Sequence, residues 1–262
     1  MADMNRFWKQ MTGIGAKLRT LLFPRRCICC AALLDAPTSG PLCSACQQKY
    51  LEARRVCCPD CRSPIAVCRC RRIGAGNVPL YSLLPYRPGR TDDPVNRLLY
   101  LCKNGGEASA EDFLAEQLAA LCECVIAEHP DIARDAWILT YPPRSAEKKR
   151  QTGHDQAEAL MNRLSRLTGL SGIPCFVREP GTGAVQKMLN PDARAENARS
   201  SYRLTPAAKT LDGRYVMLID DIATTGATLG TCASILLDAG VQGVIALTAA
   251  KTVHAPGHDT QI

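Results

Sequence analysis

The sequence predicts an α/β domain with a parallel sheet that helices cover on both faces, preceded by a small cysteine-rich module. In the second part of the chain, short apolar runs alternate with segments of helical periodicity, which is the order that parallel sheets require. The runs are continuously apolar, as is typical of strands buried on both faces. Ten of the fifteen cysteines fall between residues 27 and 70, so composition alone marks off an N-terminal module.

The elements of the sheet domain can be placed from their periodicity. Buried strands are expected at residues 136–141, 215–219 and 243–249, and helices at residues 109–128, 154–167 and 227–239. The stretch IGAGNVPL, residues 73–80, is interpreted as a linker because it is rich in Gly, Pro and Asn. The predicted division is therefore 27–72 for the cysteine-rich module and 80–254 for the sheet domain.

The composition indicates an ordered globular protein, with 46% hydrophobic and 22% charged residues. No segment reaches the roughly 18 uninterrupted apolar residues of a membrane helix. Residues 1–26 mix apolar and basic residues at helical spacing. We expect an amphipathic helix that packs on the rest of the protein, with membrane-surface binding as the alternative. Because this segment lacks the apolar core of a secretory signal, a cytoplasmic location is predicted.

The positive charge is concentrated in the first part of the chain. Residues 1–72 carry 13 Lys and Arg against 4 Asp and Glu, whereas residues 73–262 carry 19 against 21. A basic module favours a nucleic-acid or phosphate-bearing partner, although basic surfaces also occur without one. Single-stranded DNA is therefore a candidate partner.

The most informative segment is VMLIDDIATTGAT, residues 216–228. It predicts a buried strand, two carboxylates at the strand's carboxyl end, a turn of small residues and then a helix. Such a turn directs backbone N–H groups, hydroxyls and the positive end of a helix dipole at a phosphate. Asp220 and Asp221 would repel the phosphate itself, but they suit the hydroxyls of an adjoining ribose or a metal ion. The alternative, a strand end followed by an ordinary helix cap, explains one threonine but not the whole run.

This segment resembles the phosphoribosyl pyrophosphate motif of type I phosphoribosyltransferases, which implies a type I phosphoribosyltransferase-like fold. The resemblance also implies that the two aspartates contact the ribose hydroxyls, that the loop holds the 5′-phosphate, and that Mg²⁺ accompanies the ligand. The residues that carry it are Asp220, Asp221, Ala223, Thr224, Thr225, Gly226, Ala227 and Thr228.

Three further segments resemble the ComF branch of that superfamily. LLYLCKNGGE implies that Lys103 and Gly105 belong to a pyrophosphate loop, where Lys103 would act on the leaving diphosphate as Asp220 and Asp221 act on the ribose. YPPRSAEKKRQTGHDQAEAL implies phosphate contact by Arg144 or a neighbouring cation. It departs from the family pattern at three positions, Thr152, His154 and Asp155, and the last brings a negative charge toward a proposed anion site. The third segment is VQKMLNPDARAENARSSYRL. A solvated lysine and plain surface loops are the alternatives for these segments.

The cysteines of the module form two groups with zinc-binding spacing. The first contains two C-x2-C pairs separated by twelve residues, and the second pairs C-x2-C with C-x-C. Four thiolates complete a tetrahedral zinc ion and leave no position for catalysis, so these sites would be structural. Reduced structural thiols are the alternative, and the pairing, sequential or interleaved, stays open. The predicted ligands are Cys27, Cys30, Cys43, Cys46, Cys58, Cys61, Cys68 and Cys70.

Two functions remain in competition. The first is a phosphoribosyltransferase-like protein that binds phosphoribosyl pyrophosphate or a nucleotide with Mg²⁺. The second, which the ComF resemblance implies, is a factor in DNA uptake and natural transformation that binds single-stranded DNA or uptake proteins. The two are compatible, because a retained ligand-binding fold can act as a sensor without turnover.

Overall fold

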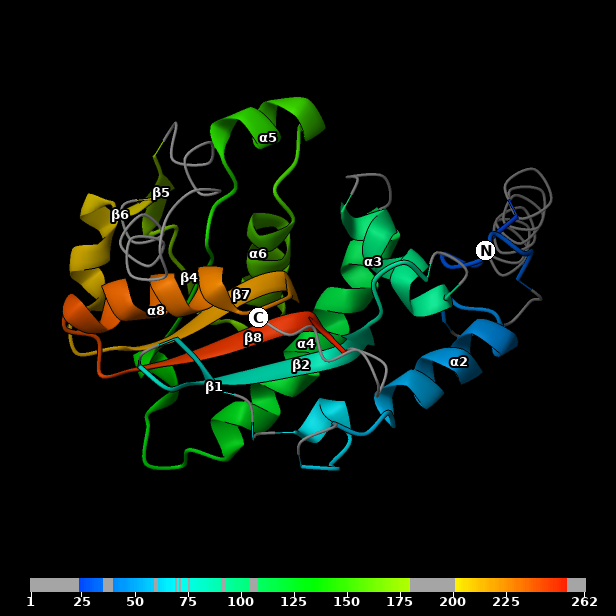
Figure 1. Ribbon diagram of the computed structural model, residues 1–262, viewed down its shortest axis with the longest axis horizontal. Helices are drawn as coiled ribbons and strands as arrows, with labels where there is room; N and C mark the ends of the chain where they lie inside the picture. Colours follow the sequence, from blue (N-terminus) through cyan, green and yellow to red (C-terminus); the bar gives the residue numbers. More distant parts are fainter. Residues whose placement is uncertain are drawn as a thin grey trace, which may run out of the picture.

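The computed structural model describes residues 24–34, 40–58, 61–68, 70, 72–74, 76–90, 93–103, 108–179 and 201–253 (Figure 1). The amphipathic helix predicted at residues 1–26 lies almost wholly outside the described residues. In the cysteine-rich part, helix α2 (Ser44–Arg54) and the short 3-10 helix η1 (Ile65–Val67) follow the described segments 24–34 and 40–43.

The centre of the protein is a six-stranded sheet in the order β1-β2-β8-β7-β3-β4. All neighbouring strands are parallel except β1 and β2, which pair in antiparallel fashion. The predicted fold class, a mostly parallel α/β sheet flanked by helices, is confirmed. The strands are β1 (Arg72–Ile73), β2 (Val78–Tyr86), β3 (Trp137–Thr140), β4 (Ser171–Gly172), β7 (Tyr215–Ala223) and β8 (Gly243–Thr252).

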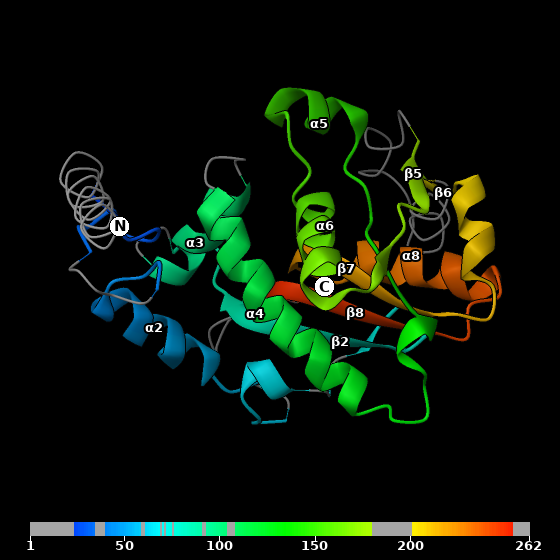
Figure 2. The same cartoon turned by 180° about the vertical axis from the view of Figure 1, so that it is seen from behind.

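Helices cover both faces of this sheet (Figures 1 and 2). One face packs against α3 (Pro94–Lys103), α4 (Ala108–Ala127) and α6 (Gln156–Thr168), and the other against α8 (Ala227–Asp238). Along β7, Met217 and Ile219 belong to the first core, and Val216 and Leu218 to the second. Strict alternation on two apolar faces explains why the strands are continuously apolar in sequence.

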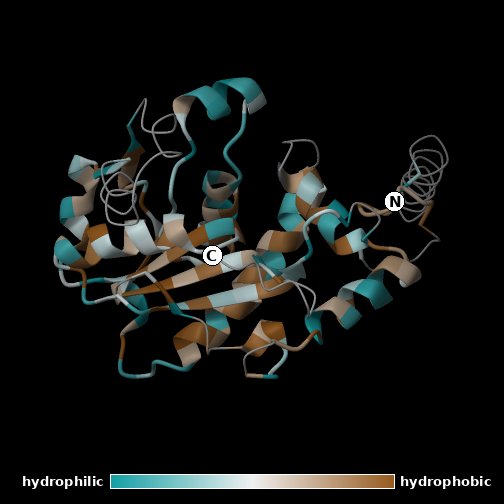
Figure 3. Ribbon diagram, viewed as in Figure 1, coloured by the Kyte–Doolittle hydropathy of each residue, from teal (hydrophilic) through white to brown (hydrophobic). Residues whose placement is uncertain are grey.

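The remaining elements lie around the sheet. The hairpin of β5 (Phe176–Arg178) and β6 (Tyr202–Leu204) and the 3-10 helix η3 (Pro206–Leu211) pack on the α8 side. The 3-10 helix η2 (Arg134–Ala136) leads into β3, and α5 (Ala146–Thr152) projects from the body on two extended segments (Figure 1). Figure 3 shows α5 as hydrophilic, in contrast to the apolar strands.

The stretch predicted as a linker, residues 73–80, is instead part of the sheet. Arg72 and Ile73 pair with Pro79 and Val78, and a turn in which Gly74 has a φ of +65° joins the two strands. A Cβ on Gly74 would lie 2.7 Å from the Cα of Gly230 in α8, so this turn packs directly on that helix. The glycines that suggested flexibility serve a tight turn and a close backbone approach.

Three other elements differ in their limits from the prediction by more than one residue, and one of them is the strand expected at 243–249, which continues to Thr252. The strand expected at 215–219 continues through both aspartates to Ala223, because β8 pairs with it along that length. The helix expected from residue 154 begins at Gln156, since the Asp155 side chain accepts a hydrogen bond from the Glu158 backbone N–H and caps it.

Candidate functional site

The aspartate pair lies at the carboxyl end of β7, near the middle of the sheet. Asp221 lies beside Arg144, which precedes α5, whereas Asp220 is near enough to Cys232 of α8 to raise the pKa of that thiol. One carboxylate oxygen of each is engaged locally: Asp220 Oδ1 accepts from the Asp221 N–H at 2.8 Å, and Asp221 Oδ1 accepts from the Ile222 N–H at 2.7 Å. These bonds tie one oxygen of each carboxylate to the backbone of the strand.

The electrostatics of the pair are unequal. Burial raises the pKa of Asp220 well above its usual range, and the adjacent charge of Asp221 adds to the shift. On the other side, Asp221 Oδ2 lies 3.9 Å from Arg144 Nη2, and both side chains are about one-fifth exposed, at 22% and 21%. A carboxylate held in this way attracts hydroxyl donors or a divalent cation.

The loop after β7 presents its small residues to solvent. Thr224, Thr225, Ala227 and Thr228 are exposed, and α8 starts directly after Gly226. The Ala227 backbone N–H donates to Thr225 Oγ1 at 3.3 Å. The start of α8 thus offers exposed hydroxyls and a helix N-terminus beside the two carboxylates, an arrangement suited to a phosphate next to a polyol.

Gly226 is required by two features of this loop. Its φ is +80°, a conformation that side chains with a Cβ rarely adopt. A Cβ would also lie 2.5 Å from Ile73 Cγ2 in β1. Gly226 thus allows a close approach of the loop to the hairpin that follows the cysteine-rich module.

Arg144 and Asp155 are brought together by the ends of the α5 segment. The backbone N–H of Arg144 donates a hydrogen bond to Asp155 Oδ2 at 2.9 Å. Asp155 is buried, with 3% of the residue exposed. Asp155 is therefore committed to backbone donors at two places, Arg144 and Glu158. Asp155, which departs from the family pattern, therefore caps α6, and its buried carboxylate faces backbone donors.

His154 belongs to a polar cluster that lies between α4 and α6. Its Nε2 lies 2.6 Å from Glu111 Oε1 of α4, and Arg163 Nη2 of α6 lies 2.7 Å from Glu111 Oε2. Glu111 is only 5% exposed. Sequence reasoning missed this acid because it stands on an apolar helix without a nearby motif. The cluster ties α4 to α6 below the α5 segment.

The other predicted site residues are located in part. Lys103 is the last residue of α3, and its side chain, like Gly105, lies outside the described part of the chain. Burial raises the pKa of Cys102 to about 12, and the charges of Glu111 and Asp221 contribute. The final turn of α3 therefore lies within electrostatic range of the aspartate pair. Of the third segment, residues 180–200 are outside the description, and Tyr202 is buried in β6 against Phe176.

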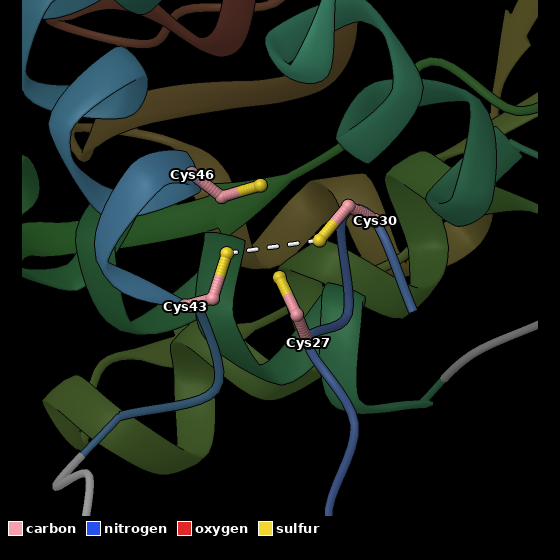
Figure 4. A group of neighbouring side chains, drawn as sticks. All are labelled: Cys27, Cys30, Cys43 and Cys46. Atoms are coloured by element: carbon pink, nitrogen blue, oxygen red, sulfur yellow. Dashed lines mark hydrogen bonds between the residues drawn. The ribbon is translucent and has the colours of Figure 1, made fainter. Parts of the chain in front are cut away.

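The first cysteine group converges on one point (Figure 4). Cys27 and Cys30 come from the loop before α2, whereas Cys43 precedes that helix and Cys46 lies in it. The four sulfur atoms all lie within 4.8 Å of one another, and Cys30 Sγ is 3.6 Å from Cys43 Sγ. A tetrahedral zinc ion with Zn–S bonds of about 2.3 Å places its sulfurs about 3.8 Å apart, so the geometry fits.

The second group fits equally well. Cys58 Sγ and Cys70 Sγ are 3.7 Å apart, Cys61 Sγ and Cys68 Sγ 3.5 Å, and all four sulfurs lie within 4.8 Å. The clusters are therefore sequential, which answers the pairing question that the sequence left open. Cys29 and Cys57 stand outside both. Two four-cysteine clusters of this geometry indicate structural zinc sites.

One residue near the second cluster was not anticipated. Lys251 of β8 is 2% exposed, and its Nζ lies 3.3 Å from Cys68 Sγ and 3.9 Å from Cys58 Sγ. It sits in an apolar strand that gave no sign of a charged role, and only the tertiary fold brings it to the cysteines.

Beside the first cluster a groove of about 320 Å³ opens between α2 and the start of α3. Lys49 and Arg97 line it together with Cys30 and Cys43. Among the described helices, none is both long enough and apolar enough to cross a membrane.

Comparison with known proteins identifies two proteins that are similar in sequence to this chain. No protein-family model matches the chain. DNA utilization protein YhgH of Escherichia coli strain K12 is 24% identical over 229 residues, which span 86% of this chain and 96% of that protein. Competence protein F of Haemophilus influenzae is 28% identical over 92 residues, 35% of this chain and 40% of that protein. The latter match thus covers less than half of its relative.

A solved structure of glutamine phosphoribosylpyrophosphate amidotransferase from B. subtilis, complexed with ADP and GMP, is 16% identical to this chain. The superposed residues span 61% of this chain and 29% of the amidotransferase chain, with a TM-score of 0.35. The sheet and the two cysteine clusters define the class: an α/β protein with a mostly parallel sheet and an N-terminal module that contains two four-cysteine clusters. In sequence the chain is similar to competence protein F and to DNA utilization protein YhgH.

Proposed function

We propose that this protein binds phosphoribosyl pyrophosphate, or the 5′-phosphate and ribose of a nucleotide, together with Mg²⁺ at the carboxyl end of β7. The observation that carries the proposal is the junction of β7 and α8. There, Asp220 and Asp221 stand beside exposed Thr224 and Thr225 at a helix start. Groups suited to an anion and groups suited to hydroxyls thus adjoin in one segment, as a ribose 5-phosphate requires.

Each residue has a role in this proposal. The N–H groups and hydroxyls of residues 224–228 hold the 5′-phosphate, with the α8 dipole favouring its charge. The second oxygens of Asp220 and Asp221 accept hydrogen bonds from the vicinal ribose hydroxyls, that of Asp221 beside its contact with Arg144. Arg144, beside Asp221, and Lys103, at the end of α3, neutralise the diphosphate.

The donor set fits Mg²⁺, since carboxylate oxygens are the ligands that this hard cation prefers. Bound Mg²⁺ supplies positive charge to the diphosphate. If the protein is also a transferase, the bond between C1′ and the diphosphate oxygen breaks as the acceptor bonds to C1′. The chain's own contribution would then be to orient the ribose and to hold the departing diphosphate on Arg144 and Lys103.

Calorimetric titration of phosphoribosyl pyrophosphate with Mg²⁺ into zinc-loaded protein tests the proposal. We expect binding by the wild type and its loss in Asp220→Asn/Asp221→Asn. Asp131→Asn, an exposed acid in the loop after α4, is the matched control and should bind as the wild type does. A well-folded wild type that binds no ligand would refute the proposal. Release of diphosphate with a supplied acceptor would extend it to catalysis.

A second candidate function is binding of single-stranded DNA in DNA uptake. Two observations favour it: the relatives are a competence protein and a DNA utilization protein, and residues 1–72 hold the chain's basic excess. Lys49 and Arg97 line the groove beside the first cluster, where they would meet phosphates.

The DNA candidate is tested separately, by fluorescence anisotropy of a labelled single strand at several salt concentrations. Binding that weakens with salt, and that Lys49→Ala/Arg97→Ala or neutralisation of Arg25, Arg26, Arg54 and Arg55 reduces, would support it. Lys209→Ala, an exposed lysine of η3 on the sheet domain, is the control. Absence of binding at low salt would eliminate this candidate.

A further inference from the structure

Lys251 is a buried cation in an unusual environment. It lies near the end of β8, paired in register with Pro85 of β2 and Ala223 of β7, and is 2% exposed. Within the described residues no ion pair joins Lys251 to a carboxylate. Its Nζ instead donates to Cys68 Sγ at 3.3 Å and to Cys58 Sγ at 3.9 Å. A buried ammonium group requires a compensating negative charge, which neutral thiols do not provide.

The four cysteines of the second cluster differ in their access to water. Cys58 and Cys68 are buried, at 2% and 1% exposure, whereas Cys61 and Cys70 are exposed. Four thiolates around a divalent metal carry a net charge of −2. Water can solvate the two exposed sulfurs but not the two buried ones. Lys251 therefore reaches the two sulfurs whose charge has no other solvation.

We propose that Lys251 is the outer-sphere cation of the metal centre formed by the second cluster. Its N–H···S bonds to Cys58 and Cys68 neutralise part of the thiolate charge and hold both ligands in position. The last strand of the sheet thereby completes a site whose ligands all come from the N-terminal module. The proposal depends on a divalent metal at this cluster and is independent of the ligand proposed for the β7–α8 loop.

The test is release of zinc from purified, zinc-loaded protein to an excess of chelator, followed with a metal-sensitive dye. The wild type should release its two zinc ions at slow rates. In Lys251→Met, one ion should leave about 10–100-fold faster, the usual effect of removing an outer-sphere partner. Lys251→Arg, which keeps the charge, should restore most of the slow release, and Lys209→Met should match the wild type. Unchanged release from Lys251→Met would overturn the proposal.

If Lys251→Met proves unstable, the direction of its effect on the melting temperature in two backgrounds still decides the test. In a Cys58→Ser/Cys68→Ser background the anionic partner is absent, so Lys251→Met should raise the melting temperature. In the cluster-intact, zinc-loaded protein the same substitution should lower it. A fall in both backgrounds would show that Lys251 contributes packing alone and would also overturn the proposal.

Discussion

Ile73 and Gly226 are in contact across the two parts of the chain: a Cβ on Gly226 would fall 2.5 Å from Ile73 Cγ2. Ile73 belongs to the hairpin that leaves the second cysteine cluster, and Gly226 to the loop proposed to hold the phosphate. The loop is therefore supported from behind by the continuation of the cysteine-rich module. This contact makes Gly226 a position where backbone conformation and steric fit can be separated by mutation.

Gly226→Ala should destabilise the protein more than Gly213→Ala. Both residues have positive φ, +80° and +69°, but a Cβ on Gly213 meets nothing within 4 Å. Both substitutions incur the left-handed strain of about 1–2 kcal/mol, and Gly226→Ala adds an overpacking cost of about 1–3 kcal/mol. Urea denaturation of both variants measures the difference. Equal losses of stability in the two variants would mean that Ile73 of β1 moves away from the added methyl group at no cost in free energy.

Asp220→Asn should stabilise the unliganded protein at pH 7 by about 1 kcal/mol. Because burial raises the pKa of Asp220 in the folded state, the native protein binds a proton more tightly than the unfolded chain. The free energy of unfolding of the wild type therefore falls as pH rises from the ordinary aspartate pKa to the raised one. Asparagine removes this dependence.

Thermal melts of wild type, Asp220→Asn and Asp131→Asn over a pH series check this. Only Asp220→Asn should melt higher at pH 7, by about 2–4 °C. The affinity of the wild type for the proposed ligand should change in the opposite direction, and rise with pH as Asp220 ionises. A lower melting temperature for Asp220→Asn at pH 7 would contradict the argument.

Glu111→Ala should cost about 3 kcal/mol, because it leaves the buried end of Arg163 beside His154 without the central acid. Asp112→Ala removes the other partner of Arg163. Because the Asp112 side chain is 60% exposed, this substitution should cost less than about 1 kcal/mol. Chemical denaturation of the two variants distinguishes a buried cluster from a surface one. Similar small losses would show that Glu111 is dispensable.

Single cysteine substitutions should lower the zinc content in a cluster-specific way. Metal analysis of the wild type is expected to give two zinc ions per chain, one for each cluster. Cys46→Ser and Cys61→Ser should each retain one. Cys57→Ser and Cys124→Ser, exposed and outside both clusters, should retain two. Full zinc content in Cys46→Ser would exclude the first cluster as a metal site.

The sequence predicted the elements whose signals are local. The strands around Val216 and Val244 and the helix after Gly226 carry unbroken apolar or periodic patterns, and the cysteine spacing predicted both clusters. The β2 strand escaped prediction because Pro79 and Pro85 interrupt it. Pro85 is tolerated because β1 pairs with only Val78 and Pro79 of β2, so that side of the strand is a sheet edge at Pro85.

The parts of the site that sequence reasoning missed are those that depend on tertiary contacts. Nothing in the local pattern around Lys251 or Glu111 distinguishes a buried charge from a surface one. The partner of Lys251, Cys68, lies 183 residues away, and the partner of Glu111, Arg163, lies on another helix. Asp155 was interpreted through its charge, whereas its role depends on the backbone N–H of Arg144. Such assignments require the fold.

The pairing of β2 with β8 has a consequence for the order in which the protein matures. Ser82 Oγ and Thr248 Oγ1 are hydrogen-bonded at 2.7 Å across 166 positions of sequence. At a synthesis rate of about 5–20 residues per second, the ribosome needs roughly 10–30 s to supply the partner strand. During that interval the cysteines of the second cluster have emerged but Lys251 has not. A nascent chain therefore presents the ligands of both clusters before β8 emerges, and β8 then closes the sheet and brings Lys251 to the second cluster.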